Sequence, residues 1–200
     1  MAGTLLVFDD AFPRANAPSG PIRNTPGTAE LAANSYPAPH RLLSIGAADP
    51  PSTYVPAIAA AARAMGRLNR LIIFGHGRVV NAAVPTGVTR VTTGIIIGAS
   101  DLTASNASTL SALRGQFERD AQAELWVCEA AAAGTAGGMS GGLLCQAIAD
   151  ALGVPVLAAT IEQQYTTADQ HEAPGGGWQS TAQFLPWEGT PVRFMPRRSR

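Results

Sequence analysis

Short apolar runs, separated by polar or glycine-rich stretches, dominate the hydrophobic pattern of this chain. They lie at residues 4–10, 40–46, 71–74, 125–127 and 154–160. Each run is rich in aliphatic and aromatic residues and is bounded by turn-forming residues, which is typical of a buried strand. The pattern therefore predicts several strands that are spread along the whole chain.

Helical patterns alternate with these runs. Residues 54–65 are Ala-rich behind a Pro-punctuated start, and residues 107–120 carry apolar side chains at helical spacing behind Ser and Asn caps. Residues 143–152 form a third predicted helix, which Gly153 closes. Strands alternating with helices predict a single α/β domain over residues 1–200. We expect a three-layer sandwich with a mostly parallel central sheet and helices on both faces.

The remaining segments are predicted to be hairpins, loops and a tail. Alternation after Gly77 predicts a β-hairpin that turns near residues 85–87, and a terminal hairpin is predicted to turn at residues 188–189. Residues 11–38 are rich in Pro, Gly, Asn and Ser, which predicts a long loop. The Arg-rich residues 197–200 are predicted to be a frayed tail.

The amino-acid composition argues against several classes of function. The formal net charge is zero, so the chain lacks the charge excess typical of proteins that bind nucleic acid or anionic membranes. All 14 basic residues are Arg, which excludes a P-loop lysine and a Schiff-base lysine. Cys128 and Cys145 are too few for a disulfide scaffold, and no segment approaches the ~20 apolar residues of a membrane span. The start lacks the basic region of a secretory signal, so we expect a cytoplasmic protein.

Two predicted strands end next to residues that can perform covalent chemistry. His76 follows the run at 71–74, and Cys128 follows the run at 125–127. If these strands are parallel neighbours, their side chains meet in the crevice at the carboxyl ends of the sheet. A thiol becomes a strong nucleophile when an imidazole takes its proton, and the N–H of Gly77 could face a developing oxyanion. Taken separately, Cys128 could be a small core residue and His76 could cap a turn.

The order of these motifs resembles the caspase-like cysteine peptidases, which include caspases, metacaspases, gingipains and the bacterial caspase-like and CHAT domains. The resemblance spans about residues 71–160 and rests on GHG at 75–77, IIIGASDLT at 95–103, LWVCEAAAAGTAGG at 125–138 and LCQAIADALGVPVLAAT at 144–160. It implies a caspase-like fold that hydrolyses protein or peptide substrates without a cofactor. It also implies a Cys128–His76 dyad, with the N–H groups of Gly77 and Cys128 forming the oxyanion hole.

The resemblance also implies a substrate preference. Arginine- and lysine-specific relatives line the S1 pocket with acidic residues, one of them at the end of the first strand, where Asp9 or Asp10 falls here. Glu129 and Glu162 are the further acidic candidates for substrate binding, so cleavage after a basic residue is one expectation. Trp126 departs from the pattern, because metacaspase-like members carry Asp at that position. The preference at S1 therefore stays open.

Other readings of the sequence remain. A catalytically inactive domain of the same fold could act as a binding or assembly subunit, since low charge and many Ala and Gly residues suit a surface that is buried against partners or in an oligomer. Residues 138–142 match G-x-S-x-G, which makes Ser140 a weaker candidate nucleophile of a serine hydrolase. Because a Gly-rich stretch matches this motif easily by chance, we interpret it as a mobile loop beside Cys128. No C-x-x-C or H-x-x-x-H spacing predicts a zinc site, and Cys145 is predicted to be a core residue.

Overall fold

The computed structural model describes residues 2–9, 33, 36–84, 87–132, 140–163, 166–172, 174, 178–184 and 186–197. The predicted loop at 11–38 and the Gly-rich loop at 133–139 therefore lie mostly or wholly outside the described residues, as does Asp10. Among the described helices, none is long and apolar enough to cross a membrane.

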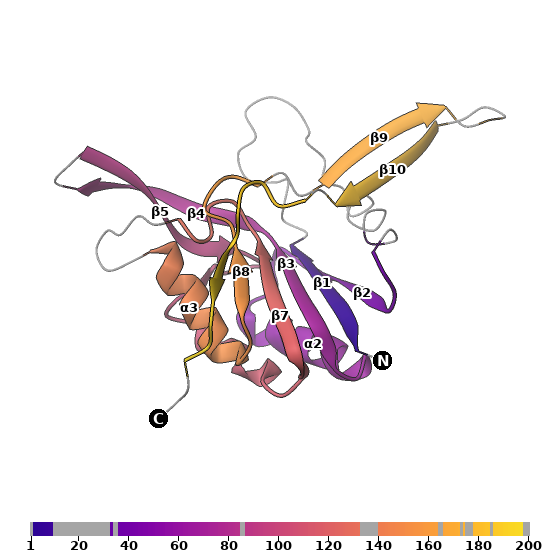
Figure 1. Cartoon of the computed structure of the whole chain (residues 1–200), viewed down its shortest axis with the longest axis horizontal. Coiled ribbons are helices and arrows are strands. Elements are labelled where there is room, and N and C mark those ends of the chain that lie inside the picture. Colours follow the sequence, from indigo (N-terminus) through magenta and orange to yellow (C-terminus); the bar gives the residue numbers. More distant parts are fainter. Residues whose placement is uncertain are drawn as a thin grey trace.

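A six-stranded sheet forms the centre of the molecule, in the order β11-β8-β7-β3-β1-β2 (Figure 1). Its strands are β1 (Gly3–Asp9), β2 (His40–Ile45), β3 (Leu68–Phe74), β7 (Phe117–Trp126), β8 (Val156–Ala158) and β11 (Val192–Phe194). The first five run parallel, and β11 is antiparallel to β8 at one edge. The α/β class and the mostly parallel sheet are thus confirmed.

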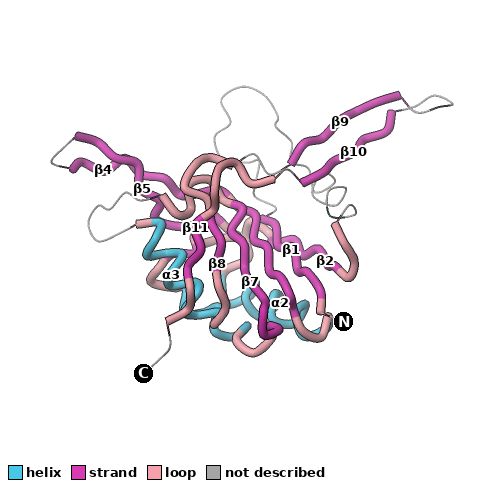
Figure 2. Tube along the Cα trace, viewed as in Figure 1, coloured by secondary structure: helices cyan, strands magenta, loops and turns pink. Residues whose placement is uncertain are grey.

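Beside this sheet lie two α-helices, a 3-10 helix and five further strands of the described residues (Figure 2). They are α2 (Pro51–Ala64), η1 (Ala107–Leu113), α3 (Gly141–Leu152), β4 (His76–Val84), β5 (Gly87–Ile96), β6 (Leu102–Thr103), β9 (Thr166–Glu172) and β10 (Trp178–Phe184). The predicted hairpin after Gly77 is confirmed, because β4 and β5 pair antiparallel up to Val84 and Gly87. Gly153, at φ 74°, closes α3 as its sequence predicts.

Strand β1 and the carboxyl halves of β3 and β7 bury both of their faces, as their nearly continuous apolar sequence requires. On one face, residues such as Leu5 and Val7 belong to the same core cluster as α2, η1 and α3. On the other face, Leu6 and Phe8 pack into a smaller cluster that includes Trp126. The period of two along each strand thus divides its side chains between two separate cores.

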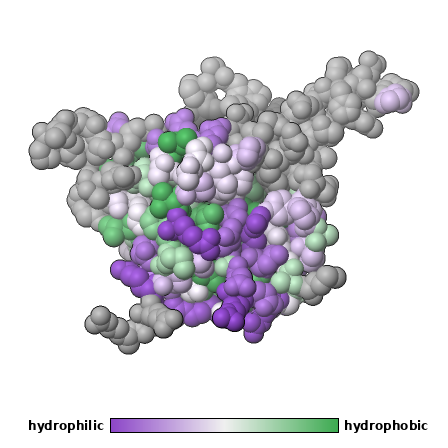
Figure 3. Space-filling view, in the orientation of Figure 1, coloured by the Kyte–Doolittle hydropathy of each residue, from purple (hydrophilic) through white to green (hydrophobic). Residues whose placement is uncertain are grey.

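The two described α-helices lie on the same face of the sheet, since both contribute to the larger core. The opposite face carries the smaller cluster and, in Figure 3, hydrophilic side chains over β3 and β7. There Arg70 pairs with the buried Glu124 at 3.1 Å, and Glu124 also accepts the indole N–H of Trp126 at 2.9 Å. Within the part of the chain that the structure describes, the expected helix layer on this face is therefore not confirmed.

The predicted helix at 107–120 is wrong. The segment forms only η1, and Arg114 then leaves the helical region at φ −58°, ψ 132°. Gly115 follows with a left-handed φ of 87°, and Phe117 begins β7 opposite Leu68 of β3. Hydrogen bonds to a sheet partner distant in sequence override the local helical spacing here.

The predicted terminal hairpin at 188–189 is also wrong. Gly189 does adopt a turn conformation, at φ 73°, but the strands on either side do not pair with each other. Instead, β10 pairs with β9 and β11 pairs with β8. Nor is the start of the predicted frayed tail free, because Arg197 forms hydrogen bonds with Asp150 of α3. Residues 198–200 lie outside the described residues.

Candidate active site

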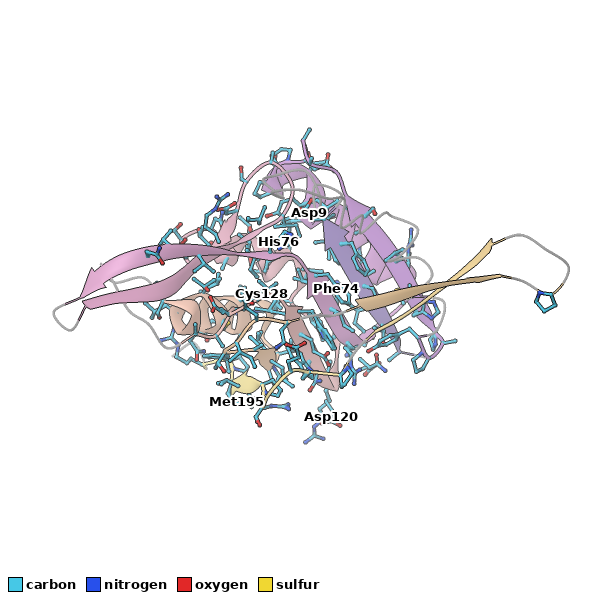
Figure 4. The ribbon with its side chains drawn as sticks, turned by 90° about the horizontal axis from the view of Figure 1, so that it is seen from above. Asp9, Phe74, His76, Asp120, Cys128 and Met195 are labelled. Atoms are coloured by element: carbon cyan, nitrogen blue, oxygen red, sulfur yellow. The ribbon has the colours of Figure 1, made fainter. Side chains whose placement is uncertain are left out.

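His76 and Cys128 lie at equal heights beyond two neighbouring parallel strands. Phe74 of β3 pairs with Trp126 of β7, and His76 and Cys128 each come two residues later. Figure 4 looks down on this edge of the sheet and shows His76 between Asp9 and Cys128. The structure therefore brings the two predicted dyad residues to the same edge.

Gly77 brings the start of β4 into contact with the residue that carries the thiol. A side chain at Gly77 would collide with the carbonyl oxygen of Cys128 and would lie 3.6 Å from Val127. Only a residue without Cβ permits this approach of the two backbones. The glycine after His76 thus serves a packing role that the sequence alone does not show.

Cys128 lies in a tight turn, which we call the cysteine turn (residues 127–132). Within it, the N–H of Ala130 donates to Val127 and the N–H of Ala132 donates to Glu129. Glu129 adopts a left-handed φ of 53°, which is uncommon for a residue other than Gly, Asn or Asp. Strained backbone of this kind persists only where the surrounding structure holds it.

Neighbouring elements hold Glu129 in that conformation from two sides. Its N–H donates to the carbonyl of Ile161 at 2.9 Å, beyond the end of β8. Its carbonyl accepts the hydroxyl of Thr92 at 2.7 Å, and Thr92 is fully buried on β5. The conformation of the cysteine turn is therefore fixed by segments that are distant in sequence.

The thiol of Cys128 is half-buried and lies against Gln163. The N–H of Gln163 donates to Sγ at 3.4 Å, and the S–H faces the carbonyl of the same residue at 3.5 Å. Burial raises the pKa of Cys128 above 9.0, and the carboxylates of Glu162 and Glu129 raise it further, against the lowering effect of the Gln163 N–H. At neutral pH the resting thiol is therefore protonated.

His76 begins β4 with an exposed side chain. Partial desolvation lowers the pKa of its imidazole below 6.5. The ring is therefore largely neutral at pH 7 and is able to accept a proton. If the protonated thiol and the neutral imidazole act as a pair, proton transfer would be part of the attack, rather than a step completed beforehand.

The second cysteine has a different environment. Cys145 is fully buried on α3, and its S–H donates to the carbonyl of Ala130 at 3.2 Å. Burial raises its pKa to about 12. Its predicted role as a core residue is confirmed, and its contact with Ala130 makes it a support of the cysteine turn.

The predicted acidic residues fall at different depths. Asp9 ends β1 and is only 5% exposed. Glu129 is half-buried in the cysteine turn, whereas Glu162 is exposed. Both glutamates are close enough to Cys128 to influence its charge. Two of the acidic candidates thus flank the thiol.

Ser140 stands at the start of α3. Its hydroxyl accepts the N–H of Leu143 at 3.1 Å and caps the amino end of α3. Residues 133–139, which precede it, lie outside the described residues, so the strand that a nucleophile elbow requires directly before its serine is not shown. The hydroxyl thus has a structural role at the start of α3, and the serine-hydrolase interpretation of Ser140 stays a prediction.

Two residues of the site escaped sequence reasoning, namely Thr92 and Gln163. Thr92 is one of several threonines on an alternating strand, and Gln163 follows an apolar run without any motif around it. Neither carries a sequence signal, because both act through partners far away in the chain. Among the described residues, no group of three or more His, Cys, Asp or Glu side chains could hold a metal ion.

A scan against protein-family models finds no matching family, and searches of curated proteins and of solved structures find no match either.

Proposed function

We propose that this chain is a caspase-like cysteine peptidase that acts on protein or peptide substrates in the cytoplasm. One observation carries the proposal: His76 and Cys128 stand at matched heights beyond neighbouring parallel strands, and Gly77 packs directly on Cys128. The left-handed Glu129 beside the thiol supports it, since strained backbone gathers at functional sites.

In the proposed mechanism, Cys128 is the nucleophile and His76 is the general acid and base. The S–H proton passes to the neutral imidazole while Sγ attacks the peptide carbonyl, and the N–H groups of Gly77 and Cys128 stabilise the oxyanion. The imidazolium then protonates the departing amine, leaving a thioester on Cys128. Water, deprotonated by His76, hydrolyses the thioester and restores the thiol.

The carboxylates beside the thiol support a preference for a basic residue before the scissile bond. Glu129 and Glu162 both act on Cys128 electrostatically. A positively charged substrate side chain would offset their charge and would lower the pKa of the thiol on binding. Substrate binding and activation of the nucleophile would then reinforce each other.

Two electrophiles test the proposal. Iodoacetamide should label Cys128 far faster than Cys145, which is fully buried and hydrogen-bonded. A peptidyl chloromethyl ketone that ends in Arg should also label Cys128, and His76→Ala should slow that reaction at least tenfold because the general base is lost. His40→Ala is the matched control, since His40 lies at the opposite, amino end of the edge strand β2, which pairs with β1. Equal, slow labelling of both cysteines would overturn the proposal.

An inactive caspase-like domain, acting as a binding or assembly subunit, is the second candidate. The raised pKa of Cys128 favours it, because a protonated thiol is a poor nucleophile. The same two reagents separate the candidates. An inactive domain would react with iodoacetamide at Cys128 but would show no faster reaction with the peptidyl ketone and no dependence on His76.

A further inference from the structure

Gln163 contacts the thiol through its backbone only. Its N–H donates to Sγ of Cys128 at 3.4 Å, and its carbonyl faces the same sulfur at 3.5 Å. The direction of that backbone determines whether the N–H points at the sulfur. A hydrogen bond from an N–H favours the thiolate over the thiol, so this contact opposes the effect of burial.

The side chain of Gln163 fixes this backbone by binding a different part of the chain. Its Oε1 accepts the N–H of Glu188 at 3.0 Å, and its Nε2 donates to the carbonyl of Glu188 at 2.9 Å. Nε2 also donates to the carbonyl of Glu162 at 2.9 Å. Gln163 is only 6% exposed, so the amide is held in one orientation by its partners.

The segment bound by Gln163 is residues 187–189, which we call the clamped segment. It connects the β9–β10 hairpin with the edge strand β11. Trp187 packs on Trp126 with ring centroids 4.5 Å apart. Gly189 lies close to Ile161, because a Cβ atom added to this glycine would be 3.1 Å from the Ile161 side chain. The clamped segment therefore rests on the strand that leads to Cys128 and on the segment that leads to Gln163.

We propose that Gln163 is a positioning residue that holds the Cys128 thiol and links it to the clamped segment. Movement of residues 187–189 would turn the Gln163 backbone and withdraw its N–H from the sulfur. Docking of the clamped segment would then determine how readily Cys128 ionises. This positioning role rests on the proposed function in one respect, namely that Cys128 is the nucleophile.

The electrostatic surroundings of the thiol are otherwise set by a few groups. Glu129 lies on the cysteine turn itself, Glu162 precedes Gln163, and Glu188 belongs to the clamped segment. On β4 the titratable groups are His76 and Arg78, and Arg78 pairs with Asp101. None of these groups is altered when Gln163 is substituted by Ala, so a change in ionisation would reflect the lost positioning.

The test compares Gln163→Ala with Gln146→Ala in the full chain. Gln146 is a matched control, because its amide anchors another segment to α3 by donating to the Met195 carbonyl at 2.8 Å and to Asp150 at 2.9 Å. The rate of alkylation of Cys128 by iodoacetamide is measured from pH 6 to pH 10 by mass spectrometry. Unfolding in urea is recorded for each variant to show that both remain folded.

Gln163→Ala should move the pH midpoint of alkylation upward by about 0.7 to 1 unit, a five- to tenfold slower reaction at pH 7. Gln146→Ala should leave the midpoint unchanged. An unchanged midpoint in folded Gln163→Ala, or an equal shift in both variants, would overturn the positioning role. The proposed function fails differently, through slow labelling of Cys128 in the unsubstituted chain or through no effect of His76→Ala on the peptidyl ketone reaction.

Discussion

Glu129 is the residue whose own conformation is most unusual. Its φ of 53° places a side-chain-bearing residue in the left-handed region, directly after the thiol. We expect Glu129→Gly to be more stable than Glu129→Ala by about 1 kcal/mol, because both lose the carboxylate but only Gly avoids the Cβ clash. Urea unfolding of the two variants measures this difference. Equal stability would mean that the turn relaxes when the side chain is removed.

The pKa shifts of Cys128 and His76 predict a pH dependence at the same scale. Burial raises the pKa of the thiol above 9.0, and desolvation lowers the pKa of the imidazole below 6.5. Alkylation of Cys128 should therefore rise with pH to a midpoint above 9, because only the thiolate reacts. Peptide hydrolysis should rise through a midpoint below 6.5, because His76 must be neutral to accept the proton. An alkylation midpoint below 7 would indicate a preformed thiolate–imidazolium pair instead.

At the scale of elements, the hairpin β4–β5 supports the site from both of its strands. Gly77 of β4 packs on Cys128, and Thr92 of β5 holds the carbonyl of Glu129. The hairpin therefore does more than connect β3 with β7, since it fixes the cysteine turn and carries His76.

Thr92→Val tests the part played by β5. Removing the buried hydroxyl should destabilise the fold by about 1 kcal/mol, since the Glu129 carbonyl keeps its bond from the Ala132 N–H. Thr93→Val is the matched control, because its hydroxyl bonds to Arg78 at an exposed position and its loss should cost under about 0.5 kcal/mol. Chemical denaturation compares the two, and iodoacetamide labelling shows whether the cysteine turn changes. Equal costs would contradict a special role for Thr92.

The hydrophobic pattern along the chain predicted the elements well where a short apolar run is buried in the folded protein. The strands β1, β2 and β3 and the helices α2 and α3 all appear within a few residues of their predicted limits. The segment after Leu113 was mistaken for helix because its apolar spacing is helical, whereas its hydrogen-bonding partner, β3, lies about fifty residues earlier. Pairing between distant strands outweighs local propensity in such places.

At the scale of the whole molecule, β1 and the carboxyl halves of β3 and β7 are buried on both faces, although α2 and α3 lie on the same face. Ile72 and Ile73 are adjacent on β3, each 1% exposed, and they point into different core clusters. Substituting either by Ala should destabilise the protein by about 2–4 kcal/mol, because each leaves a cavity in a packed core. Urea unfolding checks both variants. If Ile72→Ala, but not Ile73→Ala, lowers the free energy of unfolding by less than about 1 kcal/mol, the smaller cluster is loosely packed.

The sequence by itself determined the α/β class and most of the strands. It also determined that His76 and Cys128 come shortly after the runs that form β3 and β7. These follow from local apolar runs and from the glycine and polar residues that bound them. Only the tertiary structure decided that those strands are neighbours in register, that Gly77 meets Cys128, and that Gln163 lies against the thiol. The physical reason is that these contacts join segments tens of residues apart, and a single sequence does not record which distant backbones pair.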